Sequence, residues 1–121
     1  MTGPTMPSID VTEAERRLRE DPAHPLLLDV REVSEFEEVR APGAVLVPTS
    51  SFAARVAELP ADRPLMVVCH LGSRSAAVTG FLMRSGRTDV VNVAGGMDAW
   101  ERAGLPVRHG TPAPGEGDVP A

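Results

Sequence analysis

Short runs of apolar residues, separated by segments with a helical pattern, constrain the fold of this chain more than any other feature. The runs cover residues 26–30, 44–47, 65–68 and 89–93. Such short runs with almost no polar alternation are typical of strands buried on both faces. Strands of this kind that alternate with helices indicate a parallel sheet with helices on both sides. We therefore predict an α/β domain.

The segments between the runs carry signals for helix starts and ends. Thr12, with Glu15 three residues later, has the pattern of a capping box and predicts a helix that ends near Glu20. Ser34 is the expected N-cap of a short helix through Val39. Further helices are expected over residues 51–58, 76–84 and 97–103.

The composition changes at both ends of the chain. Residues 1–7 are expected to form a flexible lead, and residues 8–108 a single domain that can bury a core without metal or disulfide. Residues 109–121 are mostly Pro, Gly, Thr, Asp and Glu, with almost no large apolar side chain. This composition predicts a disordered C-terminal tail.

Charge and cysteine content exclude several classes of function. The net charge is −5, and no basic stripe is present, so we expect no nucleic-acid partner. One cysteine excludes an internal disulfide and a zinc site built on a cysteine pair, and we expect no metal or other cofactor. No apolar run has the roughly 20 residues of a membrane helix, and no signal-peptide pattern opens the chain. We therefore expect a cytoplasmic protein with no membrane partner.

The single cysteine, Cys69, follows the apolar run 65–68 directly and precedes a helical segment. The loop between them consists of His70, Leu71, Gly72, Ser73, Arg74 and Ser75. Backbone N–H groups at such a turn, together with the helix dipole, favour anions and lower the pKa of a thiol. Because ligands of parallel sheets bind at the carboxyl ends of the strands, Cys69 is the candidate nucleophile.

Three groups of residues resemble the motifs of rhodanese-like domains, in the same order and at similar spacing. They are an entry segment (residues 28–32, 35–36, 42–44 and Pro48), an active-site loop (residues 69–75) and a closing segment (residues 92–97, Trp100 and residues 104–107). The resemblance extends from about Ser8 to Val107. It implies a three-layer α/β/α domain with a five-stranded parallel sheet in the order 1-5-4-2-3.

The resemblance also implies sulfur transfer through a cysteine persulfide. Cys69 would take the outer sulfur of thiosulfate, or of a similar small anionic donor, and pass it to cyanide or a thiol. The thiol would belong to glutathione, thioredoxin or another sulfur-accepting protein. Backbone N–H groups from His70 to Ser75 would stabilise the persulfide and the leaving anion. Gly72 would permit the turn, Arg74 would contact an oxyanion or brace the loop, and Ser75 would cap the helix or donate to sulfur.

The loop departs from the family pattern at one position. Rhodanese-like domains often have arginine directly after the cysteine, whereas this chain has His70. A histidine is only partly charged near neutral pH, so we expect less fixed positive charge and weaker use of thiosulfate. Arg40 is a second possible source of charge, and the sequence leaves its direction open.

Other interpretations of the site remain open at this point. Asp29 and Arg31 follow or end a predicted strand, and we expect Asp29 to cap a turn or pair with an arginine that supports the loop. A non-catalytic or redox-sensing module on the same fold is the main alternative function. A phosphatase or arsenate reductase fits less well, because only four residues separate Cys69 from Arg74 where cysteine phosphatases have five.

Overall fold

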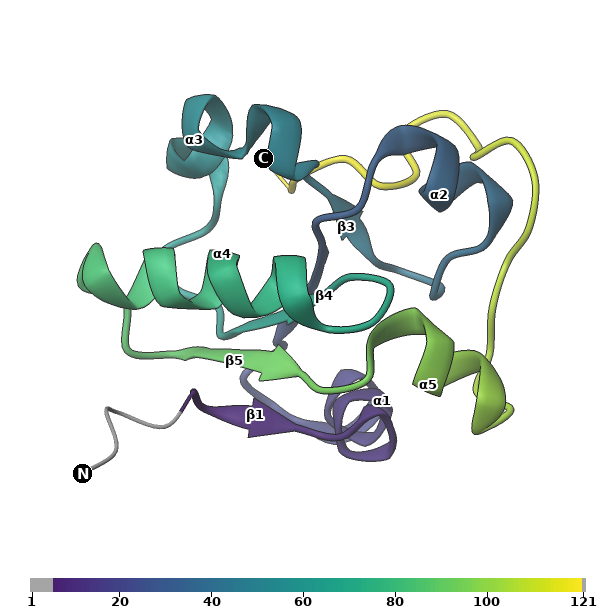
Figure 1. The fold of residues 1–121 in the computed structure, drawn as a ribbon, viewed down its shortest axis with the longest axis horizontal. Helices are drawn as coiled ribbons and strands as arrows, with labels where there is room; N and C mark the ends of the chain where they lie inside the picture. Colours follow the sequence, from purple (N-terminus) through teal and green to yellow (C-terminus); the bar gives the residue numbers. More distant parts are fainter. Residues whose placement is uncertain (1–5, 121) are drawn as a thin grey trace.

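The computed structural model describes residues 6–120 and contains one five-stranded sheet in the order β1-β5-β4-β2-β3 (Figure 1). All neighbouring strands are parallel. The strands are β1 (Ser8–Ile9), β2 (Leu26–Asp29), β3 (Val45–Leu46), β4 (Leu65–Val68) and β5 (Val90–Val93). The predicted α/β fold and strand order are confirmed.

Five α-helices cover the two faces of the sheet. They are α1 (Val11–Glu20), α2 (Val33–Glu38), α3 (Phe52–Arg55), α4 (Ser73–Arg84) and α5 (Gly96–Arg102). Core side chains from α3 and α4 pack on one face, and those from α1, α2 and α5 pack on the other. This is the three-layer arrangement that the resemblance implies. None of the helices between residues 6 and 120 has the length and apolar composition that crossing a membrane requires.

The central strand β4 explains where the cysteine lies. Its residues are fully buried, and alternate side chains enter different layers: Met66 and Val68 join the core with α1 and α5, whereas Leu65 and Val67 join the core with α4. The alternation continues to Cys69, which belongs to the α4 side. The thiol therefore lies beneath the start of α4.

Two predicted helix N-caps are wrong by two residues each. Helix α1 is capped by Asp10 rather than Thr12, because Asp10 Oδ1 accepts hydrogen bonds from the Glu13 N–H (2.8 Å) and the Thr12 hydroxyl (2.7 Å). Helix α2 has Glu32 as its N-cap instead of Ser34, and the Glu32 N–H donates to Glu35 Oε1 (3.0 Å). Both helices use an acidic side chain where a hydroxyl is predicted.

The predicted helix over residues 51–58 is α-helical only over α3. Two 3₁₀ turns flank it, η1 (Thr49–Ser51) and η2 (Val56–Glu58). The flexible lead predicted over residues 1–7 lies, up to residue 5, outside the described residues.

The C-terminal segment is the main difference from the prediction. Composition predicts disorder from residue 109, but residues 109–120 run from α5 past α2 toward α3 (Figure 1, yellow). Arg40, only 3% exposed, is held by Glu116 (2.5 Å) and by the Gly110 carbonyl oxygen (2.7 Å). The Leu46 N–H on β3 donates to the Gly117 carbonyl oxygen (2.8 Å). Backbone groups and one buried arginine thus fix this segment, which we call the strap.

Candidate active site

The Cys69 thiol is buried, with 1% of the residue exposed, and two polar groups contact its sulfur. The Gly72 N–H donates to Sγ (3.1 Å), and the thiol donates to Ser75 Oγ (3.3 Å). The Ser75 hydroxyl donates to the Gly72 carbonyl oxygen (3.1 Å). Ser75 therefore contacts the sulfur and holds the first turn of α4, but the two roles predicted for it are not those observed: the N-cap of α4 is Gly72, and Ser75 accepts from the thiol instead of donating to it.

The surroundings of the thiol affect its pKa in opposite directions. Burial raises the pKa of Cys69. Hydrogen bonds from the Ser75 hydroxyl and from the backbone N–H groups of Ser75, Gly72 and Arg74 lower it, and together they outweigh burial. The pKa of Cys69 therefore lies below its ordinary value, which favours the thiolate that a nucleophile needs.

Two loop carbonyls are tied to the start of α5, which holds the loop from the side opposite α4. The Met97 N–H donates to the Cys69 carbonyl oxygen (2.8 Å), and the Asp98 N–H donates to that of His70 (3.0 Å). Gly96 has φ +59°, and a Cβ there would overlap the same two carbonyl oxygens. The close approach of α5 to the loop therefore requires glycine at this position.

Gly96→Ala is expected to displace the loop, because the added methyl group overlaps backbone that cannot rotate away. The free energy of unfolding should fall by about 3 kcal/mol, and sulfur transfer should weaken more than tenfold. Urea unfolding and steady-state rates measure the two effects. Gly43→Ala is the matched control, since Gly43 also has positive φ (+80°) but no neighbour within 4 Å of the added Cβ. Equal effects of the two substitutions would show that backbone strain alone is responsible.

The Arg74 guanidinium forms an ion pair with a carboxylate of α2. Its two guanidinium nitrogens Nη1 and Nη2 donate to Glu35 Oε1 (2.7 Å) and Oε2 (2.9 Å). This bidentate pair joins the start of α4 to α2 across the loop. Of the two predicted roles for Arg74, the structure therefore shows the one that braces the loop.

The pair predicts a pH-dependent stabilisation. The hydrogen bonds from Arg74 lower the pKa of Glu35 from its ordinary value of 4.5 to about 2. A lowered carboxyl pKa stabilises the fold above the unfolded value and loses this effect as the pH falls through the folded value. Glu35→Gln should therefore reduce the free energy of unfolding by about 1 kcal/mol at neutral pH. The difference from wild type should shrink between pH 4.5 and about 2. Urea titrations across this range would contradict the prediction if the difference stayed constant.

Asp29 pairs with an arginine, which is one of the two roles expected for it, and that arginine is Arg31 in a buried ion pair. Arg31 Nη2 donates to Asp29 Oδ2 (2.8 Å), and the two side chains are 2% and 0% exposed. The Arg31 guanidinium also donates to the carbonyl oxygens of Glu35 (3.3 Å) and Val39 (2.6 Å). The pair thus fixes α2, which in turn presents Glu35 to Arg74.

The remaining loop side chains face solvent. His70, Leu71 and Ser73 are exposed, Leu71 to 64%. His70 lies in a cleft of about 400 Å³ that Arg31, Glu35, Glu38 and Glu101 also line. Arg40 is absent from this cleft, since Glu116 and Gly110 hold it in the core. Among the described residues no cluster of histidine, cysteine and acidic side chains has the arrangement of a metal site.

Sequence reasoning did not assign roles to two residues of the site. Glu35 was part of the resemblance without a function, and its pairing with Arg74 spans 39 positions in the chain. Gly96 likewise was only part of the closing segment of the resemblance, without a role of its own. Its sequence signal was the Gly95-Gly96 pair at the end of a predicted strand, where a second backbone often approaches closely.

Comparisons with known proteins agree with this geometry. The family model for the rhodanese-like domain matches residues 10–103. A sulfurtransferase of Allochromatium vinosum is 35% identical over 99 residues, covering 82% of this chain and 92% of the relative. Thiosulfate sulfurtransferase GlpE of Actinobacillus succinogenes is 37% identical over 82 residues, covering 68% and 74%. A rhodanese-related protein of Thermoplasma volcanium superposes with a TM-score of 0.77 at 29% identity, covering 84% and 97%.

Proposed function

The chain belongs to the rhodanese-like domain family and is a sulfurtransferase, and from this we propose that Cys69 carries the transferred sulfur as a persulfide. The observation that carries the proposal is the position of Sγ, which meets the Gly72 N–H and the Ser75 hydroxyl at the start of α4. The Gly72 N–H stabilises negative charge on sulfur both before and after transfer, and the Ser75 hydroxyl can turn to donate to the sulfur once the thiol has lost its proton.

The first half-reaction loads the enzyme. The Cys69 thiolate attacks the outer sulfur of thiosulfate, or of a similar small anionic donor, and the sulfur–sulfur bond of the donor breaks. Sulfite leaves with the bonding electron pair, and the new persulfide keeps one negative charge. The Gly72 N–H lies at the sulfur and can stabilise this charge, whereas the Arg74 guanidinium is already paired with Glu35.

The second half-reaction transfers the outer sulfur from the Cys69 persulfide to an acceptor. A thiolate or cyanide attacks the outer sulfur of the persulfide, and Cys69 leaves as a thiolate. The chain has no second cysteine, so an internal disulfide cannot release the sulfur and the acceptor must be another molecule. Glutathione, thioredoxin or a sulfur-accepting protein has the required thiol, and such acceptors fit a reducing, cytoplasmic setting.

Intact-protein mass spectrometry after incubation with thiosulfate tests the proposal. The expected result is the gain of one sulfur atom, which cyanide or a reductant removes. Adding reduced glutathione or thioredoxin to the persulfidated protein should accelerate the loss of that sulfur. A mass that never changes with any sulfur donor, or a sulfur that leaves at the same rate without an acceptor, would contradict it.

His70→Arg is expected to improve the use of thiosulfate. Arginine adds a permanent charge next to Cys69, whereas histidine side chains in general are mostly neutral at alkaline pH. The KM for thiosulfate should fall at pH 8 by up to about fivefold. His24→Arg adds the same charge at a distant position and is the control. An unchanged KM at pH 8 would mean that the side chain at position 70 points away from the donor.

A further inference from the structure

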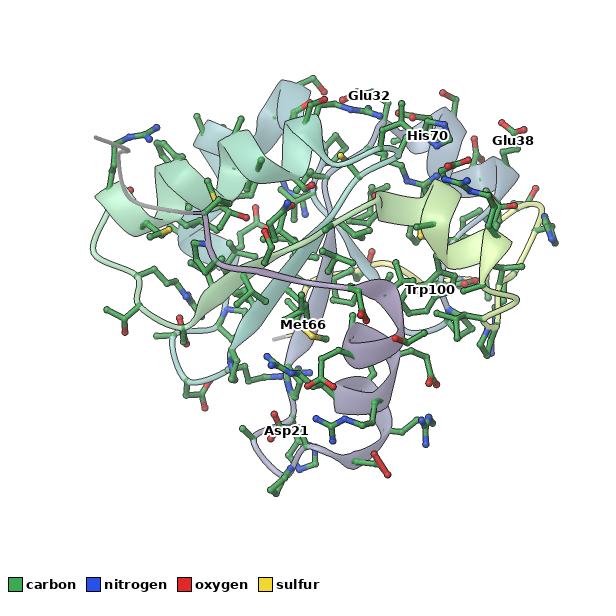
Figure 2. The ribbon with its side chains drawn as sticks, turned by 60° about the horizontal axis from the view of Figure 1, so that its bottom comes forward. Asp21, Glu32, Glu38, Met66, His70 and Trp100 are labelled. Carbon is green, nitrogen blue, oxygen red and sulfur yellow. The ribbon has the colours of Figure 1, made fainter. Side chains whose placement is uncertain are left out.

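The cleft beside the active-site loop has an excess of acidic groups. Three carboxylates line it: Glu35, Glu38 and Glu101. They come from α2 and α5, the two helices that flank His70. In Figure 2, His70 and Glu38 lie near each other at one end of the molecule, while Asp21 lies at the opposite end.

The arginines of this region offset only the charge of Glu35. Arg31 is neutralised by Asp29 in a fully buried pair, and Arg74 by both oxygens of Glu35. The side chains of the loop therefore present no guanidinium free to bind a divalent anion. His70 is the remaining basic side chain of the loop itself, and His109 lines the far side of the cleft, where its Nδ1 lies 3.1 Å from the Glu38 carbonyl oxygen.

Glu38 and Glu101 are the uncompensated charges. Both are exposed, and within residues 6–120 neither forms an ion pair. A cleft whose charge has one sign changes the local concentration of charged molecules that enter it. The effect here repels anions and attracts cations.

We propose that this cleft selects the sulfur donor by charge and favours persulfides of small amine-bearing thiols over the thiosulfate dianion. The inference rests on the proposed persulfide mechanism. The chemistry with such a donor is balanced without a further reactant. The Cys69 thiolate attacks the outer sulfur of R–S–SH, the sulfur–sulfur bond breaks, and R–S⁻ leaves with the electron pair while the outer sulfur keeps its proton. Glu38 and Glu101 act on the approach of the ammonium group and not on the reacting atoms.

The test uses three persulfides that react in the same way and differ only in the group at the far end. They are the persulfides of 2-aminoethanethiol, 2-mercaptoethanol and 3-mercaptopropionate, with thiosulfate as a fourth donor. The measured quantity is the second-order rate of Cys69 persulfidation, followed by intact mass under single-turnover conditions. At low salt the ammonium donor should react about tenfold faster than the carboxylate donor.

Salt and substitutions separate charge from other causes. High salt should slow the ammonium donor and accelerate both the carboxylate donor and thiosulfate, so that the tenfold difference between the ammonium and carboxylate donors shrinks to about twofold. The double substitution Glu38→Gln with Glu101→Gln should produce the same shrinkage at low salt. Glu20→Gln with Asp62→Asn removes two exposed charges near the amino ends of the strands and should leave the difference unchanged.

The outcomes distinguish this inference from the proposed function. Equal rates for the three persulfides at low salt, or an unchanged difference in the Glu38 and Glu101 variant, would overturn the charge selection while leaving the persulfide mechanism intact. No persulfidation of Cys69 by any of the four donors would overturn the mechanism itself.

Discussion

Replacing Cys69 with serine is expected to abolish sulfur transfer from thiosulfate to cyanide. A serine hydroxyl at this position would occupy nearly the same volume and would retain the Gly72 N–H as a donor. It cannot form a persulfide, because the transferred sulfur needs a sulfur nucleophile to bond to. We expect at least a thousandfold loss of rate, down to the uncatalysed background.

The loss must occur without unfolding to be informative. Circular dichroism and a thermal melt of Cys69→Ser should match those of wild type to within a few degrees, because the substitution removes little volume from a site with polar neighbours. The intact mass of the variant should not change with thiosulfate. Retained turnover in a folded Cys69→Ser protein would show that the sulfur travels by another route.

Asp29→Asn is expected to have the largest effect on stability. It leaves the Arg31 guanidinium, which is 2% exposed, buried without a counter-charge. Removing one partner of a buried pair typically costs about 3–5 kcal/mol, because the remaining charge cannot reach water. The midpoint of urea unfolding should fall accordingly, and activity should fall with it because Arg31 also holds the carbonyl oxygens of Glu35 and Val39.

Asp98→Asn provides the matched control for this substitution. Asp98 pairs with Arg102 at 2.7 Å, but the arginine side chain is 77% exposed. Surface pairs of this kind contribute little, so the expected loss is about 0.5 kcal/mol or less. If both variants lose the same stability, burial of the Asp29–Arg31 pair does not have the effect assigned to it.

The sequence predicts what depends on neighbouring residues. The apolar runs place the strands, and the local sequence around Cys69 places the thiol where a strand ends and a helix begins. The sequence also suggests that Asp29 pairs with an arginine, and the partner that the structure shows, Arg31, is only two positions away. Each of these features can be inferred from a short window of sequence.

Features that depend on distant residues were not predictable in this way. The role of Glu35 follows from its contact with Arg74, and both residues look like ordinary surface charges in the sequence. The composition of the strap predicts disorder because it has almost no large apolar side chains that could join a core. Its contacts instead use the backbone of Gly110 and Gly117 together with buried Arg40, and composition contains no information about backbone partners.

The strap also determines how the sheet ends. Strand β3 is at one edge of the sheet, and an edge strand with free N–H and C=O groups is a template for pairing with strands of other chains. Here the Leu46 N–H is already bonded to the Gly117 carbonyl oxygen, and Gly117 lies against the ring of Phe36. Another molecule that approaches this side of the sheet meets a folded segment of the same chain instead of an open strand. The C-terminal segment thus covers part of an edge that would otherwise be open to pairing, although its composition is that of a flexible linker.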